Sequence, residues 1–213
     1  MPDALYQLTS GAPAAALILL VILAVSIIGL SGRPRLIEDN LFRPYFISRR
    51  RNYYTWISSG FVHGSYAHLL FNALTLWSFG VPLERAMGTP RFVALYLIGL
   101  LASDIGTYLK QRNNPQYASL GASGAILAVL FASIIYFPTQ SIYFMIIPIP
   151  IPAWLFAIGY LAYTFYASRH ARDRINHDAH LGGAVTGLLF VGLTDPQAVA
   201  DAWRLLSQAR SIH

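Results

Sequence analysis

Two side chains in this sequence could together perform nucleophilic chemistry. Ser123 lies in the tetrapeptide GASG at the start of an apolar run, and His180 opens a later apolar run in AHLGGAVTG. A histidine near neutral pH can accept a serine hydroxyl proton, which activates the serine as a nucleophile. Each motif alone is more typical of helix packing, so the hypothesis depends on the two being brought together.

Glycines accompany both motifs at helical spacing. They are Gly121, Gly124, Gly183 and Gly187. Small residues at this spacing let two helices approach closely, and such packing brings the serine and the histidine to one end of a bundle. The first turn of the serine helix also has free backbone N–H groups, which favour a developing negative charge.

A second polar pair lies in the segment HLLFN. His68 and Asn72 are four residues apart and therefore share one helix face. Their N–H groups are suitable donors to an oxyanion, which acyl transfer requires. The alternative is that the two side chains only satisfy each other, or bond to a neighbouring helix.

No acid clearly completes a triad. Asp178 precedes His180 by two residues and is expected in the loop, and Asp104 is expected to hydrogen-bond locally or to reach the membrane interface. A Ser–His dyad remains a workable variant, because the roles matter more than the number of members.

The composition indicates the environment in which these side chains act. The chain has 213 residues, of which 55% are hydrophobic and only 11% are charged, far fewer charges than in ordinary globular proteins. The absence of cysteine excludes disulfides and thiolate chemistry. The net charge of +6 is mostly arginine and suits anionic lipid, whereas the scattered positions disfavour nucleic-acid binding.

Long apolar runs predict an all-α membrane protein with six transmembrane helices in one domain, 1–213. The expected spans are about 14–30, 67–83, 92–109, 121–137, 151–167 and 179–193. The leader before the first span has no Lys or Arg, which favours a retained helix over a secretory signal. The long connection after it is expected to fold as a partly membrane-embedded loop. The segment IIPIPIP predicts an extended approach to the fifth span.

The order of three motifs is similar to that of the rhomboid family of intramembrane serine proteases. They are SSGFVHGSYAHLLFNALTLWSFGVPLERAMG, SLGASGAI and AHLGGAVTG, within about residues 50 to 190. The resemblance implies a six-helix core around a water-filled cavity, with Ser123 as nucleophile and His180 as its base. It also implies an oxyanion hole of His68, Asn72 and the Ser123 amide, transmembrane protein substrates, and no metal or cofactor.

The resemblance extends to further positions and fails at two. His63 matches a histidine often found before the HxxxN motif, and ERAMG matches a region that is expected to be structural. Thr55 stands where the family often has an arginine, and Leu127 stands where an aromatic residue often stacks on the catalytic histidine. Both departures affect support for the site rather than a reacting group.

Two other functions fit parts of the sequence. One is a catalytically silent rhomboid-like protein that binds or escorts membrane proteins, although such relatives typically lack the serine or the histidine. The other is a small transporter, which would place polar groups along a path through the bilayer. Here the polar groups gather near one face, which favours the protease.

The expected location is a bacterial inner membrane, which the chain would cross several times. Its orientation is left open by two conflicting arguments. The loops on the Ser123 side carry most of the basic residues, which predicts a cytoplasmic active site, whereas the family resemblance predicts the opposite face. The basic residues on that side are Arg33, Arg35, Arg43, Arg49, Arg50, Arg51, Lys110, Arg112, Arg169, Arg172 and Arg174, against Arg85, Arg91, Arg204 and Arg210 on the other.

Overall fold

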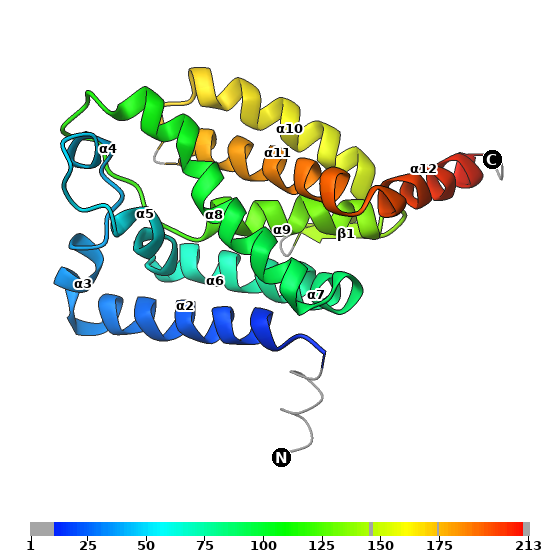
Figure 1. Cartoon of the computed structure of the whole chain (residues 1–213), viewed down its shortest axis with the longest axis horizontal. Coiled ribbons are helices and arrows are strands. Elements are labelled where there is room, and N and C mark those ends of the chain that lie inside the picture. The colour runs from blue at the N-terminus through cyan, green and yellow to red at the C-terminus, as the bar shows by residue number, and fades with distance from the viewer. Residues whose placement is uncertain (1–10, 145–146, 174, 211–213) are drawn as a thin grey trace, which may run out of the picture.

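The computed structural model describes residues 11–144, 147–173 and 175–210. The leader that favoured a retained helix, and Arg174 of the orientation argument, lie outside this part. Figure 1 shows a bundle of helices with α2 along one edge and α10 along the opposite edge. The helix α12 projects from one end of the bundle.

Helices occupy all six predicted ranges. The long helices are α2 (Pro13–Gly32), α6 (Tyr66–Thr75), α7 (Val81–Met87), α8 (Thr89–Gln111), α9 (Ser123–Tyr136), α10 (Ala153–His170), α11 (His177–Thr194) and α12 (Pro196–Arg210). A π-helical segment, η2 (Leu76–Gly80), makes α6 and α7 continuous. The fourth helix begins at Ser123 rather than at Gly121, because Gly121 has a φ of 117°, which no right-handed helix allows.

The prediction of six membrane-crossing helices is not confirmed. Among the described residues, α2 and α8 are the two helices whose length and apolar composition suffice for a crossing. With 14 residues, α9 is about 21 Å long at 1.5 Å per residue, less than the roughly 30 Å of a hydrocarbon core. The helices α10 and α11 carry polar ends, SRH and HDAH, which lower their apolar character.

The fold is mostly helical rather than all-α. A two-stranded antiparallel sheet, β1 (Ser141–Phe144) and β2 (Ile147–Pro152), lies between α9 and α10. Ser141 pairs with Pro152 and Ile142 with Ile151. Alternating prolines exclude a helix in β2, and a proline can occupy a strand of a sheet that has only edges. The predicted extended segment is therefore one arm of a hairpin.

The helix α9 lies at the centre of the bundle. Every residue from Gly124 to Ile134 is buried, as expected for a helix that is apolar all round. Its contact with α11 is a backbone contact, since a Cβ placed on Gly183 would lie 2.1 Å from the carbonyl oxygen of Gly124. The same test on Gly187 gives 2.2 Å from the carbonyl oxygen of Ala128. Glycine is therefore required at both positions of α11.

The long first loop is folded and bonded to the segment that precedes Ser123. Its short helices are α3 (Pro34–Glu38), α4 (Pro44–Ile47), α5 (Thr55–Ser58) and η1 (Ser59–Phe61). The backbones of Phe42 and Ser119 exchange two hydrogen bonds of 2.9 and 3.0 Å, and the Gly121 N–H donates to the Ser59 carbonyl at 2.9 Å. These bonds fix the chain that leads into α9.

The start of α2 is held by a distant carboxylate. Buried Glu84, in the ERAMG motif, accepts hydrogen bonds from the backbone N–H groups of Ala14 and Ala15 at 3.0 and 2.7 Å. It also accepts from the Thr89 hydroxyl at 2.7 Å. A negative charge here satisfies two free N–H groups and complements the helix dipole. Glu84 therefore joins α2 to the α7–α8 corner.

Candidate active site

The structure brings Ser123 and His180 together. Ser123 is the first residue of α9, and its Oγ lies 2.9 Å from Nε2 of His180, in the first turn of α11. The side chain of Asn176 caps α11 by accepting from the Ala179 N–H at 3.1 Å, which fixes where that helix begins. Close glycine packing of α9 on α11 then sets the separation of the two side chains.

A tyrosine that the sequence did not single out contacts the other ring nitrogen of His180. The hydroxyl of Tyr160, on α10, lies 3.1 Å from His180 Nδ1. Tyr160 is one of several aromatic residues in an apolar helix, and nothing in its neighbourhood in the sequence distinguishes it. Only the packing of α10 against α11 reveals the contact.

His68 lies against the backbone just before Ser123. A Cβ placed on Gly121 would lie 2.5 Å from Cε1 and 2.9 Å from Nε2 of the His68 ring. Gly121 is therefore required twice, by its positive φ and by the proximity of this ring. Gly124 is also tightly surrounded, with Ser103 Oγ 2.2 Å from the position of its absent Cβ.

Asn72 and His63 are buried near His68. The Asn72 side-chain amide donates to the His68 carbonyl at 3.0 Å, so one of its N–H groups is used within α6. His63 Nδ1 lies 2.9 Å from Ser26 Oγ of α2, and the rings of His63 and His68 are 4.8 Å apart, edge to face. Burial, with a smaller contribution from His68, lowers the pKa of His63, in the loop before α6, to about 3.

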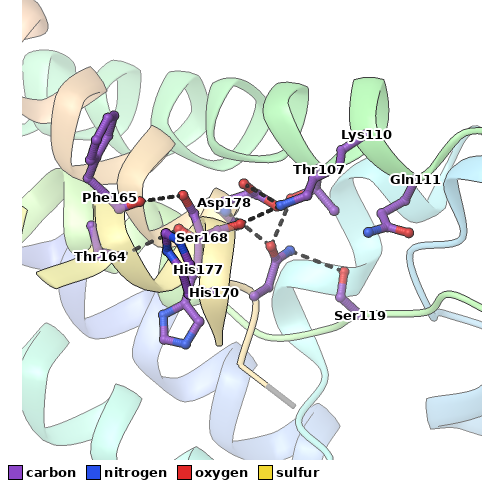
Figure 2. Close-up of polar contacts among 12 residues, drawn as sticks. Thr107, Lys110, Gln111, Ser119, Thr164, Phe165, Ser168, His170, His177 and Asp178 are labelled. Carbon is purple, nitrogen blue, oxygen red and sulfur yellow. Dashed lines mark hydrogen bonds and ion pairs between the residues drawn. The ribbon is translucent and has the colours of Figure 1, made fainter. Parts of the chain in front are cut away.

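The two acids considered from the sequence bond to groups other than His180. Asp178 lies in the first turn of α11 rather than in the loop, because the helix begins at His177. Figure 2 shows its ion pair with Lys110 of α8, at 3.0 Å, and the further bond from Lys110 to the Ser168 carbonyl of α10. Asp104 accepts weakly at 3.4 Å from Asn176, the N-cap residue of α11, rather than from a local partner.

The two departures from the rhomboid pattern have structural partners of their own. Thr55 is fully buried and donates from Oγ1 to the Asn52 carbonyl at 2.7 Å, closing the turn at the start of α5. Leu127 is buried in an apolar cluster with Phe131 and Ala184. Both residues stabilise the fold locally.

A small polar cavity adjoins the serine. Its lining includes Ser59, Ser103, Asp104, Ser119 and Asn176 together with Ser123. In the part of the chain that the structure describes, no group of His, Asp or Glu side chains has the arrangement of a metal site. The polar side chains named in its lining are serine hydroxyls, the Asn176 amide and the Asp104 carboxyl.

Comparisons with known proteins identify the family of the chain. Residues 50–195 match the Rhomboid domain. The chain is 34% identical over 137 residues to Rhomboid protein 1, mitochondrial, of Saccharomyces cerevisiae, covering 63% of this chain and 40% of that protein. It is 33% identical over 147 residues to Rhomboid protease GluP of Bacillus subtilis, covering 68% of this chain and 27% of that protein.

A human protein shows a comparable likeness. Presenilin-associated rhomboid-like protein, mitochondrial, of Homo sapiens is 32% identical over 139 residues, which cover 62% of this chain and 36% of that protein. The matched part thus spans less than half the length of these relatives. Since several of the similar proteins carry mitochondrial names, the predicted bacterial inner membrane is not supported. The match to the Rhomboid domain covers more than half of the sequence, and the chain is a membrane protein that belongs to the rhomboid family.

Proposed function

We propose that this protein is an intramembrane serine endopeptidase that cleaves transmembrane proteins with a Ser123–His180 dyad. The observation that carries the proposal is the 2.9 Å separation of Ser123 Oγ and His180 Nε2. One similar protein is named a protease, Rhomboid protease GluP. The proposal includes six bundle helices within the bilayer, of which α9 is too short to reach both surfaces.

The first chemical step follows from the orientation of the dyad. With Nδ1 protonated, His180 presents an unprotonated Nε2 to the Ser123 hydroxyl and accepts its proton. Ser123 Oγ then forms a bond to the carbonyl carbon of the scissile peptide. The imidazolium later returns the proton to the leaving amine, and a water molecule hydrolyses the acyl-enzyme by the same route.

The oxyanion of the tetrahedral intermediate requires donors near Ser123. The Ser123 backbone N–H belongs to the first turn of α9, where no intrahelical acceptor exists. His68 lies against Gly121, so its ring lies close to the backbone that leads into Ser123. Asn72 uses one amide N–H on the His68 carbonyl and retains a second for the substrate. His63, packed on His68, supports this side of the site.

Covalent labelling tests the dyad directly. We expect a fluorophosphonate probe to label the detergent-solubilised wild type, and labelling to be lost in both Ser123→Ala and His180→Ala. In subtilisin, removing the serine or the histidine lowers the turnover rate by roughly a millionfold. Ser133→Ala is the matched control, because Ser133 is a buried serine of the same helix.

The outcomes separate the protease from a silent relative. Labelling of wild type and Ser133→Ala, with none in the two dyad variants, supports an activated serine. A wild type that unfolds cooperatively but is not labelled overturns the proposal and favours a protein that binds membrane partners without cleaving them.

A further inference from the structure

We propose that Tyr160 is the third member of the site, a positioning residue whose hydroxyl accepts a hydrogen bond from Nδ1–H of His180. This inference rests on the proposed serine chemistry and assigns a part to a residue of α10. The two contacts of the imidazole carry it: Ser123 Oγ at 2.9 Å from Nε2, and Tyr160 Oη at 3.1 Å from Nδ1.

The tautomer of His180 decides whether the dyad can work. A neutral imidazole has one protonated and one unprotonated nitrogen, and the base must have Nε2 unprotonated. The proton then resides on Nδ1, where it needs an acceptor. Tyr160 Oη lies at that position, whereas Asp178 pairs with Lys110 and Asp104 accepts from Asn176.

The ring of Tyr160 is held firmly enough to direct its hydroxyl. It stacks on Phe156, one turn earlier in α10, with centroids 5.4 Å apart and planes at 26°. It also packs on the fully buried Phe131 of α9 at 5.8 Å. Phe131 belongs to the same helix as Ser123, so the Tyr160 ring packs directly on the helix that carries the serine.

A tyrosine acceptor differs from the aspartate of a triad. Its oxygen carries no charge, so it orients the imidazole and stabilises the imidazolium less strongly than a carboxylate. It also comes from a helix that buries little of its own surface. The orientation of the base therefore depends on α10 being seated against α11.

The test uses the chain of 213 residues in detergent and the kinetics of fluorophosphonate inactivation. Tyr160→Phe removes only the hydroxyl oxygen and keeps the ring packing. Because a hydrogen bond to a charged group is lost, we expect the maximal inactivation rate to fall by about tenfold to a hundredfold, with the probe concentration for half-maximal rate unchanged. Tyr163→Phe is the matched control, since Tyr163 lies one turn on in α10 and is 54% exposed.

Each outcome has a distinct meaning. An unchanged maximal rate in Tyr160→Phe overturns the inference, and so does a change confined to the half-maximal concentration, which would make Tyr160 a contact of the probe. An absence of labelling in the wild type instead contradicts the proposed function, so the two failures are distinguishable.

A spectroscopic measurement keeps the inference testable if Tyr160→Phe does not fold. In wild-type protein with ¹⁵N-labelled histidine, the His180 nitrogens, assigned with His180→Ala, should show a protonated Nδ1 and an unprotonated Nε2. A proton found on Nε2 would make Tyr160 the donor and would overturn the assignment. In folded Tyr160→Phe, the two tautomers should become mixed.

Discussion

The α9–α11 pair and the helix α10 are held in the bundle by different means. In α9 every residue from Gly124 to Ile134 is buried, and α11 touches its backbone through Gly183 and Gly187. In α10 the buried residues are only Ala153, Thr164 and Ala167. Its large exposed side chains are Trp154, Leu155, Ile158, Tyr163, Phe165 and Tyr166.

This difference in packing places the two reacting side chains on rigid helices and their neighbour Tyr160 on a less tightly held helix. Ser123 and His180 lie on the tightly packed pair, whose interior cannot shift without creating voids or clashes. Tyr160 lies on the helix with few buried contacts, the kind of element that opens at low free energy.

The largest effect is expected from shortening matched isoleucines in the two regions. Ile126 of α9 is 2% exposed and Ile158 of α10 is 61% exposed. Ile126→Ala should lower the free energy of unfolding by about 2–5 kcal/mol, because a cavity remains in the core. Ile158→Ala should change it by less than about 0.5 kcal/mol. Denaturant titration in detergent micelles measures both, and equal losses would contradict the comparison.

A smaller effect is expected from adding one methyl group to the α9–α11 contact. Gly183→Ala places a Cβ on the Gly124 carbonyl and should lower the unfolding free energy by about 1–3 kcal/mol. Fluorophosphonate labelling of Ser123 should slow as well, because the two side chains separate.

Gly192→Ala provides the control within the same helix. No atom lies within 4 Å of the position of its absent Cβ, so the change should be neutral or slightly stabilising. If Gly183→Ala kept wild-type labelling and stability, α9 and α11 could accommodate the added methyl group at little cost, and the expectation would be wrong.

The smallest effect is expected when the pH is lowered. It tests whether the first loop, which contains His63, is packed as tightly as α9 and α11. Burial keeps His63 neutral in the folded protein, with its pKa lowered to about 3 from 6.5. Between these values the unfolded chain binds a proton that the folded protein does not. The contribution of neutral His63 to the free energy of unfolding is therefore complete above pH 6.5. It falls as the pH decreases, by about 1.4 kcal/mol per pH unit for one buried histidine.

His63→Gln should reduce this slope in unfolding measurements between pH 6.5 and 5. Ser26→Ala removes the hydrogen bond to His63 but leaves the histidine in place. It should lower stability by a similar amount at each pH and keep the wild-type slope. A slope unchanged in His63→Gln would mean that the ring is protonated in the fold.

The positions of the helices could be predicted because apolar runs and breakers are local features. Gly88 and Pro138 end helical runs, and the helices lie within a few residues of the predicted ranges. The number of crossings could not be predicted in this way, since the buried centre of a bundle is apolar for the same reason as a membrane span. The short α9 illustrates this, because its apolar side chains face other helices.

The site was predictable in part. Ser123 and His180 stand beside glycines whose spacing indicates a close helix pair, so their meeting could be anticipated. Tyr160 could not be found, because a tyrosine in an apolar helix shows its hydroxyl partner only after packing. The hairpin of β1 and β2 was anticipated only as extended chain, since the proline pattern excludes a helix without specifying a pairing partner.

The carboxylate of Glu84 imposes an order in time on the assembly of the protein. The bonds from Ala14 and Ala15 to this residue join positions 70 and 69 residues apart. At roughly 5–20 residues per second of synthesis, about 4 to 14 seconds pass between the two ends of the bond. During that interval water or lipid headgroups must satisfy the first N–H groups of α2. The start of α2, the first described helix to be synthesised, therefore cannot form its hydrogen bonds to Glu84 until the α7–α8 corner has been made.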